Sequence, residues 1–295
     1  MNVPTKLAAF AGVLGLTFGV ALAAGALIDP TDEPPAGDHA DGGAAHSSEG
    51  GDQHRDQLPG GLAVSANGYA LEVDRALYSP GQPAPFTFRI TDDRGRTIRG
   101  AFELEHDKEL HLVVVRRDTA VFEHVHPVKG DDGTWSIDLN LPAPGTYRAF
   151  ADFKIGDDRQ TLATDLFVGG DFQPRVLPDP RSTARALDAS GRSSEFDVTL
   201  SAPGTGAARE TGLSFAVARS GLPFDGLEPY LGAKGHLVAL REGDLAYLHV
   251  HPTAAHGNEI NFAATFPTPG RYRLFLQFQT GGEVRTASYT LEVPR

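Results

Sequence analysis

The sequence HLVVVRRDTAVFEHVHP at residues 111–127 returns as HLVALREGDLAYLHVHP at residues 236–252. The offset of 125 residues holds without a gap over 43 aligned positions, of which 15 are identical. The identities fall mainly on His, Pro, Gly and aromatic residues, and they continue through PAPGTYRAF at 142–150 and PTPGRYRLF at 267–275. A repeat of this length indicates a duplicated domain and not a short solenoid unit.

The composition sets broad limits on the class of protein. A chain of 295 residues is long enough for two ordinary domains, each with its own core. The net charge of −12, without a basic stripe to neutralise phosphates, argues against a nucleic-acid partner. The chain has no cysteine, which excludes disulfides, thiolate metal sites and a cysteine nucleophile.

The N-terminus, residues 1–28, predicts a membrane anchor or a signal peptide. Residues 7–28 are uncharged and mostly apolar behind Lys6. At ~1.5 Å per residue, a helix of this length crosses the ~30 Å hydrocarbon layer. A cleaved signal peptide is the alternative, because residues 21–26 fit the small-residue cleavage pattern, but its apolar region is usually only about 7–15 residues long. Either way, the remaining chain is expected on the extracytoplasmic side, held by one transmembrane helix or secreted.

Residues 29–60 predict a disordered, acidic tether. They hold eight Asp or Glu against one Arg and show no apolar periodicity, so they cannot bury enough surface to fold. The tract also contains His39, His46 and His54. These side chains could collect metal ions weakly, but the composition favours a solvated spacer.

Residues 61–170 change to short β-type runs between turn signals, without sustained helical periodicity. About seven short strands in ~100 residues are typical of an immunoglobulin-like sandwich. Tyr147, which follows a Pro-Gly turn, stands where such folds place a tyrosine whose hydroxyl bonds back to the chain. The expected strands are 69–73, 85–91, 110–116, 121–124, 134–139, 146–154 and 161–168.

Residues 171–295 repeat this organisation, with 171–194 expected as a proline-rich connection between the domains. The fold class predicted is therefore all-β: two tandem immunoglobulin-like (cupredoxin-like) β-sandwich domains, each folding as its own sandwich. The expected strands are 196–201, 213–219, 236–241, 245–249, 259–264, 272–279 and 284–293.

The repeated histidines are the candidate site. If residues 241–244 form the turn of a hairpin, His236 faces His249, and the same register sets His111 opposite His124. Side chains alternate along strands, so the third histidine of each copy shares the same face. A shift of two residues keeps this result, whereas a shift of one destroys it.

Three imidazoles at cross-strand spacing can converge on one ion, as three-histidine sites do for zinc or copper. The alternative is structural: a neutral histidine at the margin of an apolar face, hydrogen-bonded to a carbonyl, has the same pattern. Retention of all three histidines in both copies, while their neighbours differ, favours metal ligands. The candidate ligands are His111, His124, His126, His236, His249 and His251.

Several residues differ between the copies. His106 aligns with Leu231, and Asp152 aligns with Gln277, so a fourth ligand, if present, would not be the same in both domains. We expect Asp152 to be a solvated carboxylate near a turn.

Three other motif classes do not fit. The cupin pattern needs a Glu after His-x-His and a later His, and both are missing. A blue-copper site needs a cysteine. A serine hydrolase would need a nucleophile elbow, which the sequence lacks. A zinc hydrolase with three histidines and an open water position is a third, weaker interpretation, because it needs a nearby general base and the sequence offers no convincing one. We therefore expect a protein that is not an enzyme.

The repeated pattern HLVxV/L-R…F/Y-x-H-x-H-P followed by P-x-P-G-x-Y-R-x-F resembles bacterial, frequently actinobacterial, membrane-anchored or secreted β-sandwich proteins. The stretch LEPYLGAKGH at 227–236 strengthens the resemblance, which covers most of residues 61–295. The resemblance implies copper or other heavy-metal handling in the cell envelope. The first interpretation is thus an extracytoplasmic copper- or zinc-binding protein. The alternative is a non-metal envelope interaction module with structural histidines, whose protein partner the sequence does not identify.

Overall fold

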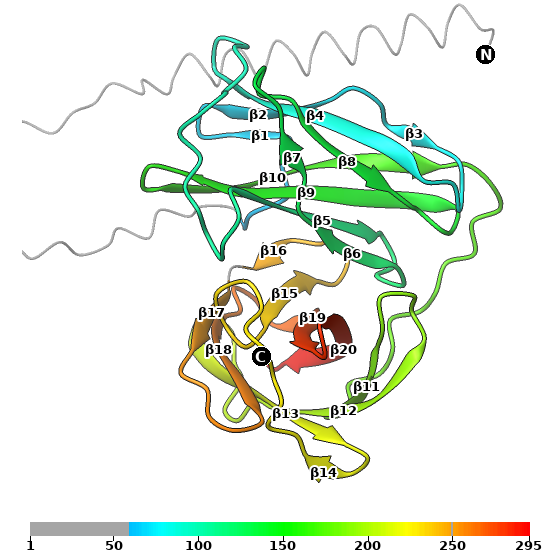
Figure 1. Cartoon of the computed structure of the whole chain (residues 1–295), viewed down its shortest axis with the longest axis vertical. Coiled ribbons are helices and arrows are strands. Elements are labelled where there is room, and N and C mark those ends of the chain that lie inside the picture. The colour runs from blue at the N-terminus through cyan, green and yellow to red at the C-terminus, as the bar shows by residue number, and fades with distance from the viewer. Residues whose placement is uncertain (1–58, 249) are drawn as a thin grey trace, which may run out of the picture. The chain divides into compact units, whose positions relative to one another are not determined.

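The computed structural model describes residues 59–248 and 250–295, and this part of the chain is built from β-strands and loops (Figure 1). The anchor expected at 1–28, nearly all of the tether expected at 29–60, and His249 lie outside the described residues. Within the described residues, no helix is long and apolar enough to cross a membrane.

The first domain is a sandwich of two five-stranded sheets, with strand orders β1-β2-β4-β8-β7 and β3-β10-β9-β5-β6. Its core lies between the sheets and includes Phe86, Phe88 and Trp135. Burial alternates along most of β4, because one side of that strand faces this core and the other faces solvent. Its strands are β1 Ser65–Ala66, β2 Tyr69–Val73, β3 Leu77–Tyr78, β4 Ala84–Asp92, β5 Leu110–Arg116, β6 Phe122–Val125, β7 Val128–Lys129, β8 Trp135–Leu139, β9 Gly145–Ile155 and β10 Asp158–Val168.

The second domain repeats the fold, but its two layers are connected. β11 pairs with β12 and, through Leu187 and Thr286, also with β20, so all ten strands belong to one bent sheet. Its own core includes Phe215, Phe262 and Phe278. The strands are β11 Thr183–Leu187, β12 Ser193–Ser201, β13 Glu210–Arg219, β14 Leu222–Pro223, β15 His236–Arg241, β16 Tyr247–Leu248, β17 Val250–Thr253, β18 Glu259–Thr265, β19 Gly270–Thr280 and β20 Glu283–Val293.

Both domains contain the predicted tyrosine corner. Tyr147 donates its hydroxyl hydrogen bond to the Ala143 carbonyl at 2.8 Å, and Tyr272 donates to the Thr268 carbonyl at 2.8 Å. Both rings are fully buried. The all-β class, the two repeated domains and their immunoglobulin-like sandwich architecture are therefore confirmed.

The connection between the domains is shorter than predicted. β11 and the start of β12 lie inside the stretch 171–194, so the segment without a strand runs from residue 169 to residue 182. In β11 only Ala186 is buried. Such a strand carries too little apolar periodicity to be recognised in the sequence.

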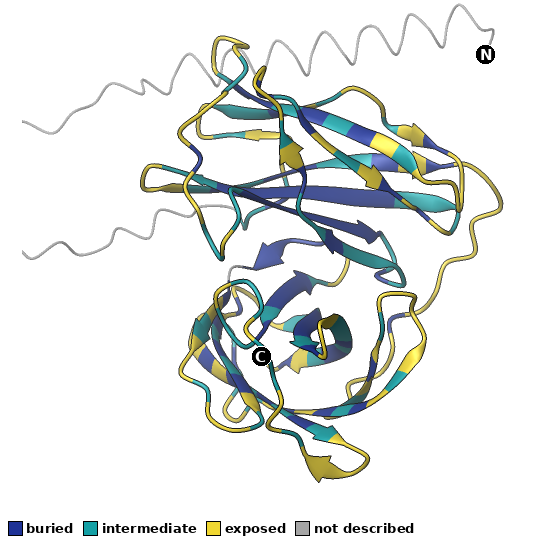
Figure 2. Cartoon of the chain, viewed as in Figure 1, coloured by how far each residue is buried: buried dark blue, intermediate teal, exposed yellow. Residues whose placement is uncertain are grey.

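The two domains also share a third core, which the sequence does not predict. β5 is buried at every position, because one face covers the first domain's core and the other packs on the second domain. Where the two hairpins lie beside each other, Figure 2 shows β5, β15 and β16 mostly dark blue and β6 mostly teal. We call this apolar cluster the interdomain core. Its members are Val113, Val115, Phe150, Ala163, Val238, Leu240, Leu245, Tyr247 and Phe275, with Phe122 packed against them.

The interdomain core has a pseudo-twofold arrangement. Phe122 stacks on Phe275 with ring centres 4.0 Å apart, and Phe150 contacts Tyr247 at 5.4 Å. In the repeat, Phe122 is equivalent to Tyr247 and Phe150 is equivalent to Phe275. Exchange of the two domains therefore converts one contact into the other. Equivalent faces of the two copies therefore pack on each other, as in an isologous dimer.

The chain that enters the first domain takes part in this contact. The Tyr247 backbone N–H donates to the Gly60 carbonyl at 2.9 Å, and the Gly61 N–H donates to the Thr161 carbonyl at 2.7 Å. Gly61 has φ +73, and a Cβ there would lie 2.5 Å from the Phe150 ring. Only glycine fits this conformation and this close approach without displacing the ring.

Candidate metal centre

The first hairpin brings its three histidines together. β5 and β6 pair Val113 with His124, two residues from the expected register, which keeps His111 and His124 on one face. The chain then passes from β6 to β7 in the other sheet, and His126 lies at this crossing. Its Nε2 is 3.2 Å from His111 Nδ1.

In the second hairpin, His236 lies on β15 and His251 on β17, whereas His249 lies outside the described residues, so a three-histidine site in this copy stays a prediction. β15 and β16 show the same two-residue shift, pairing Leu240 with Tyr247. The chain then enters β17, which pairs with β18 in the opposite layer, so His251 is exposed beside Ala263. The sequence pattern could not show that the chain passes from one layer of the bent sheet to the other before its last histidine.

His236 instead joins the histidines of the first domain. Its ring lies 5.3 Å from that of His111 with 7° between the planes, and 4.6 Å from that of His124. Ligand atoms of His111, His124 and His236 all lie within 4.8 Å of one another. Because His111 and His236 are equivalent residues of the two copies, they meet near the pseudo-twofold axis. We call His111, His124, His126 and His236 the histidine cluster.

Hydrogen bonds determine which ring nitrogens are protonated. His111 Nε2 lies 2.9 Å from the Glu105 carbonyl oxygen, which can only accept, so Nε2 carries the proton and Nδ1 does not. The Gln277 amide nitrogen donates to the Thr286 hydroxyl, which turns its Oε1 towards His124 Nδ1 at 2.7 Å. His124 Nδ1 therefore donates, and its Nε2 is unprotonated.

The two unprotonated nitrogens, His111 Nδ1 and His124 Nε2, face each other at 3.1 Å. They cannot hydrogen-bond to one another, because neither carries a proton. With metal–nitrogen bonds of ~2.0–2.1 Å, two nitrogens on a tetrahedral ion lie about 3.3 Å apart. The observed spacing is thus close to that of two ligands on one ion. Orientation of a ligand histidine by an acceptor on its other nitrogen is the usual arrangement in metal sites.

Burial keeps the histidine cluster neutral. It lowers the pKa of His111 to about 4 and that of His126 to about 4. Burial, followed by the charge of neighbouring histidines, holds the pKa of His124 and of His236 well below the ordinary value. A neutral imidazole is the form that binds a metal ion.

Three residues that support or border the cluster were not predicted as site residues. Gln277 orients His124 across the domain boundary, and the Glu105 carbonyl orients His111. The ring of His106 lies 5.5 Å from that of His236. Gln277 and His106 could have been recognised as candidates because each differs from its equivalent residue in the other repeat copy, Asp152 and Leu231.

The expectation that Asp152 is solvated is wrong. Asp152 is 7% exposed, lies opposite His111 on β9, and accepts a hydrogen bond from the Thr161 hydroxyl at 2.8 Å. Burial raises its pKa to about 6. The interdomain contact covers this carboxylate, and that contact is not visible in the sequence.

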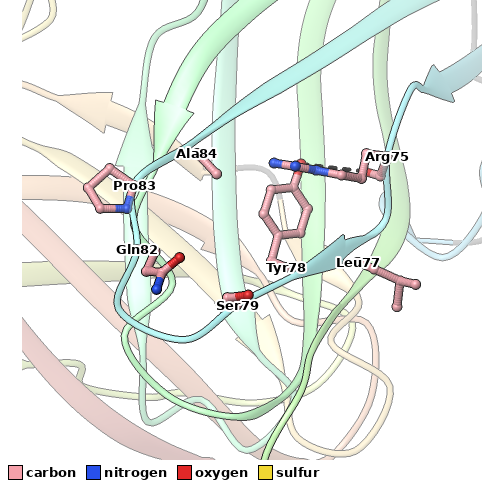
Figure 3. A pocket seen from close by; sticks show the side chains of 7 residues that line it. All are labelled: Arg75, Leu77, Tyr78, Ser79, Gln82, Pro83 and Ala84. Atoms are coloured by element: carbon pink, nitrogen blue, oxygen red, sulfur yellow. Dashed lines mark hydrogen bonds between the residues drawn. The ribbon is translucent and has the colours of Figure 1, made fainter.

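A pocket on the first domain lies at the start of β3 and β4 (Figure 3). Its charged side chain, Arg75, lies over the Tyr78 ring at 4.4 Å and donates to the Pro85 carbonyl at 3.2 Å. The remaining lining residues carry no titratable group besides Tyr78. The guanidinium is already held by its neighbours, so this pocket offers no comparable site.

Comparison with protein families identifies the chain's family. A family model described as "Domain of unknown function (DUF8832)" matches residues 64–170 and again residues 191–295. The chain belongs to this family and carries two copies of its domain. No curated protein matches the sequence.

The solved structures that match this chain include three examples, each with low sequence identity and a low TM-score. The Escherichia coli adhesin FdeC matches with 14% identity and a TM-score of 0.25, over 79% of this chain and 66% of that chain. Invasin, a bacterial integrin-binding protein, matches with 13% identity and a TM-score of 0.23, over 76% of this chain and 38% of that chain. Domains 4 and 5 of the S-layer protein SbsC match with 11% identity and a TM-score of 0.22, over 79% of this chain and 100% of that chain. The fold assignment rests on the strands and tyrosine corners described above.

Proposed function

We propose that the protein binds one copper or zinc ion at the histidine cluster, between its two domains. The observation that carries this proposal is the pair of unprotonated nitrogens of His111 and His124, which face each other at 3.1 Å inside a buried site. Lone pairs held this close repel unless a cation lies between them. A bound ion accepts both, and His126 and His236 complete a set of up to four imidazoles.

The donor set narrows the kind of metal. All four side chains are neutral imidazoles, which suit copper and zinc, whereas calcium and magnesium prefer oxygen ligands. The chain offers no thiolate, so the affinity depends on imidazoles that are already deprotonated and oriented. Preorganisation of this kind reduces the cost of ordering the ligands when the ion binds.

The location is a proposal as well. The apolar run at 7–28 supports an extracytoplasmic protein, anchored by a transmembrane helix or secreted. The acidic tract that follows would then separate the metal-binding domains from the membrane surface. Detection of full-length protein in membrane fractions after a high-salt wash would support the anchored form, and a soluble form that starts near residue 24 would support secretion.

Metal titration tests the proposed function. The full chain, purified without a histidine tag, is titrated with Cu(I), Cu(II) and Zn(II) in the presence of a competing chelator, which removes ions held weakly by the tether. We expect one tightly bound equivalent. An ion at 100 times its Kd should stabilise the fold by ~2.7 kcal/mol, measured as a rise in melting temperature.

Variants distinguish a shared site from a site in each hairpin. His124→Ala and His236→Ala should each abolish the tight equivalent, although they lie in different domains. His251→Ala serves as the matched control and should keep it, since His251 is exposed on β17. Full binding by both His124→Ala and His236→Ala would contradict the proposal and leave structural histidines as the explanation.

A further inference from the structure

A tight turn beside the histidine cluster holds a fifth histidine. Glu105 and Lys108 exchange two backbone hydrogen bonds, of 2.9 and 3.0 Å, around His106 and Asp107, whose φ values are +48 and +63. Two central residues with positive φ define a type I′ turn. Residues other than glycine seldom adopt a positive φ, and asparagine, aspartate and histidine are the ones found there most often.

The second domain has the same turn without the histidine. Tyr230 and Ala233 enclose Leu231 and Gly232, with φ values of +55 and +75. Leu231 stands at the position equivalent to His106. The turn therefore does not require an imidazole, so the imidazole of His106 needs another explanation.

The position of His106 is at the margin of the cluster. The ring is half-buried and lies 5.5 Å from that of His236 and 6.1 Å from that of His111, edge-on to both. Burial lowers the pKa of His106, and the charges of Arg159 and of the exposed His251 lower it further. Exposure thus decreases from His251 through His106 and His236 to the buried His111 and His124.

The buried ligands need a route for the ion. His111 is 3% exposed and His124 is 8% exposed, so solvent reaches these two side chains very little. An ion that exchanges its waters stepwise for imidazoles avoids the cost of crossing a buried site unligated. The partly exposed imidazole of His106, whose ring centre is 5.5 Å from that of His236, supplies such a step.

We propose that His106 is the entry ligand of the metal site: it binds the incoming ion together with His236 and passes it to His111, His124 and His126. This inference rests on the proposed metal binding. The transfer is a ligand exchange in which each new metal–nitrogen bond replaces an older one, and the oxidation state of the ion does not change. His106 lies on the route and is not a ligand of the final site.

The replacement His106→Leu tests this role in the full chain, because the second domain shows that leucine is compatible with the same turn. Cu(I), supplied as its acetonitrile complex without oxygen, is mixed rapidly with protein, and release is followed with a coloured Cu(I) chelator. A ligand on the route changes the barrier and not the end states, so uptake and release should slow by the same factor. We expect a factor of about ten, which corresponds to about 1.4 kcal/mol in the barrier.

The control is Asp107→Gly, which gives the turn the glycine found in the second domain and keeps His106. It should leave both rates unchanged, whereas an equal slowing in this control would assign the effect to the turn's backbone and overturn the proposal. Unchanged rates in His106→Leu would also overturn it, and so would a loss of equilibrium affinity, because that would make His106 a resident ligand. Absence of binding by the unmodified chain would refute the proposed function itself, which is a separate outcome.

Discussion

The stacked pair Phe122 and Phe275 provides the sharpest test of the interdomain core, on which a shared metal site depends. The two rings come from different domains, lie 4.0 Å apart and are parallel within 9°. Phe275 is 4% exposed but belongs to the interdomain core and not to the core of its own domain. Its truncation should therefore weaken the contact between the domains.

The magnitude follows from burial. Truncation of a buried phenylalanine to alanine costs roughly 3–5 kcal/mol, and an interface between domains can relax, so we expect about 3 kcal/mol for Phe275→Ala. Phe122 is half-buried, and Phe122→Ala should cost about half as much. A stacked aromatic pair adds about 0.5–1.5 kcal/mol beyond the buried area. The double variant should therefore lose about 1 kcal/mol less than the sum of the single losses.

The assay uses the chain's single tryptophan, Trp135, which is 2% exposed in the first domain's core. Urea unfolding followed by Trp135 fluorescence reports the first domain, whereas Phe275 lies in the second. If the domains stabilise each other, Phe275→Ala moves the Trp135 transition to lower urea. An unmoved transition would refute the interdomain core.

A matched control separates direct contact from general loss of stability. Phe262 is 2% exposed in the second domain's core and is not part of the interdomain core. Phe262→Leu combined with Phe122→Ala should give losses that add within about 0.5 kcal/mol, as expected for residues without contact. A coupling as large as that of the stacked pair would show that the measured interaction is not specific to the rings.

The remaining predictions concern the connection, the corners and the cluster. Protease should cut within 169–182, and the two fragments should still co-elute in size-exclusion chromatography; separate elution would contradict the interdomain core. Tyr147→Phe and Tyr272→Phe should each cost about 1 kcal/mol in urea unfolding, and no loss in either would mean that the hydroxyl contributes nothing. Gln277→Ala should weaken metal binding by about 10- to 100-fold by freeing the His124 ring, and unchanged affinity would exclude the orienting role. In the metal-free protein, the pKa of His111 is about 4, against ~6.5 in an unfolded chain. The contribution of the neutral His111 ring to the free energy of unfolding is therefore complete above pH ~6.5 and is lost as pH falls towards about 4. Between these pH values, the free energy of unfolding should change with pH less steeply in His111→Gln, by about 1.4 kcal/mol per pH unit, and equal slopes would contradict the lowered pKa.

Much of the fold could be predicted because strands and turns leave local signals. Alternating apolar residues in 85–91, bounded by Gly-Gln-Pro and Asp-Asp-Arg-Gly, correspond to β4 within one residue at each end. The Pro-Gly-x-Tyr turn predicted the tyrosine corner at Tyr147, and the repeated motif forms the same corner at Tyr272. β11 escaped detection because a polar edge segment with one buried alanine has no such pattern.

The site could be predicted only in part. Strand alternation was enough to place His111 and His124 on one face, since that result tolerates a shift of two residues. The placement of His236 on β15 and of His251 on β17 depends on where the chain passes from one layer of the sheet to the other, which is a tertiary feature. The contact between the domains is also tertiary, and it decides that His236 completes the first domain's cluster.

The duplication explains why the cluster lies where it does. In a pseudo-twofold contact, a residue near the axis meets its own counterpart, so one ancestral histidine supplies both His111 and His236 to the same point. Residues away from the axis meet a different residue of the other copy and are free to diverge. Asp152 and Gln277 occupy equivalent positions of this kind: Asp152 lies opposite His111, whereas Gln277 lies opposite His236 and hydrogen-bonds His124 of the other domain. Fusion of the two copies in one chain thus permits an asymmetric site, in which one domain contributes most of the imidazoles and the other contributes His236 and the amide that orients His124.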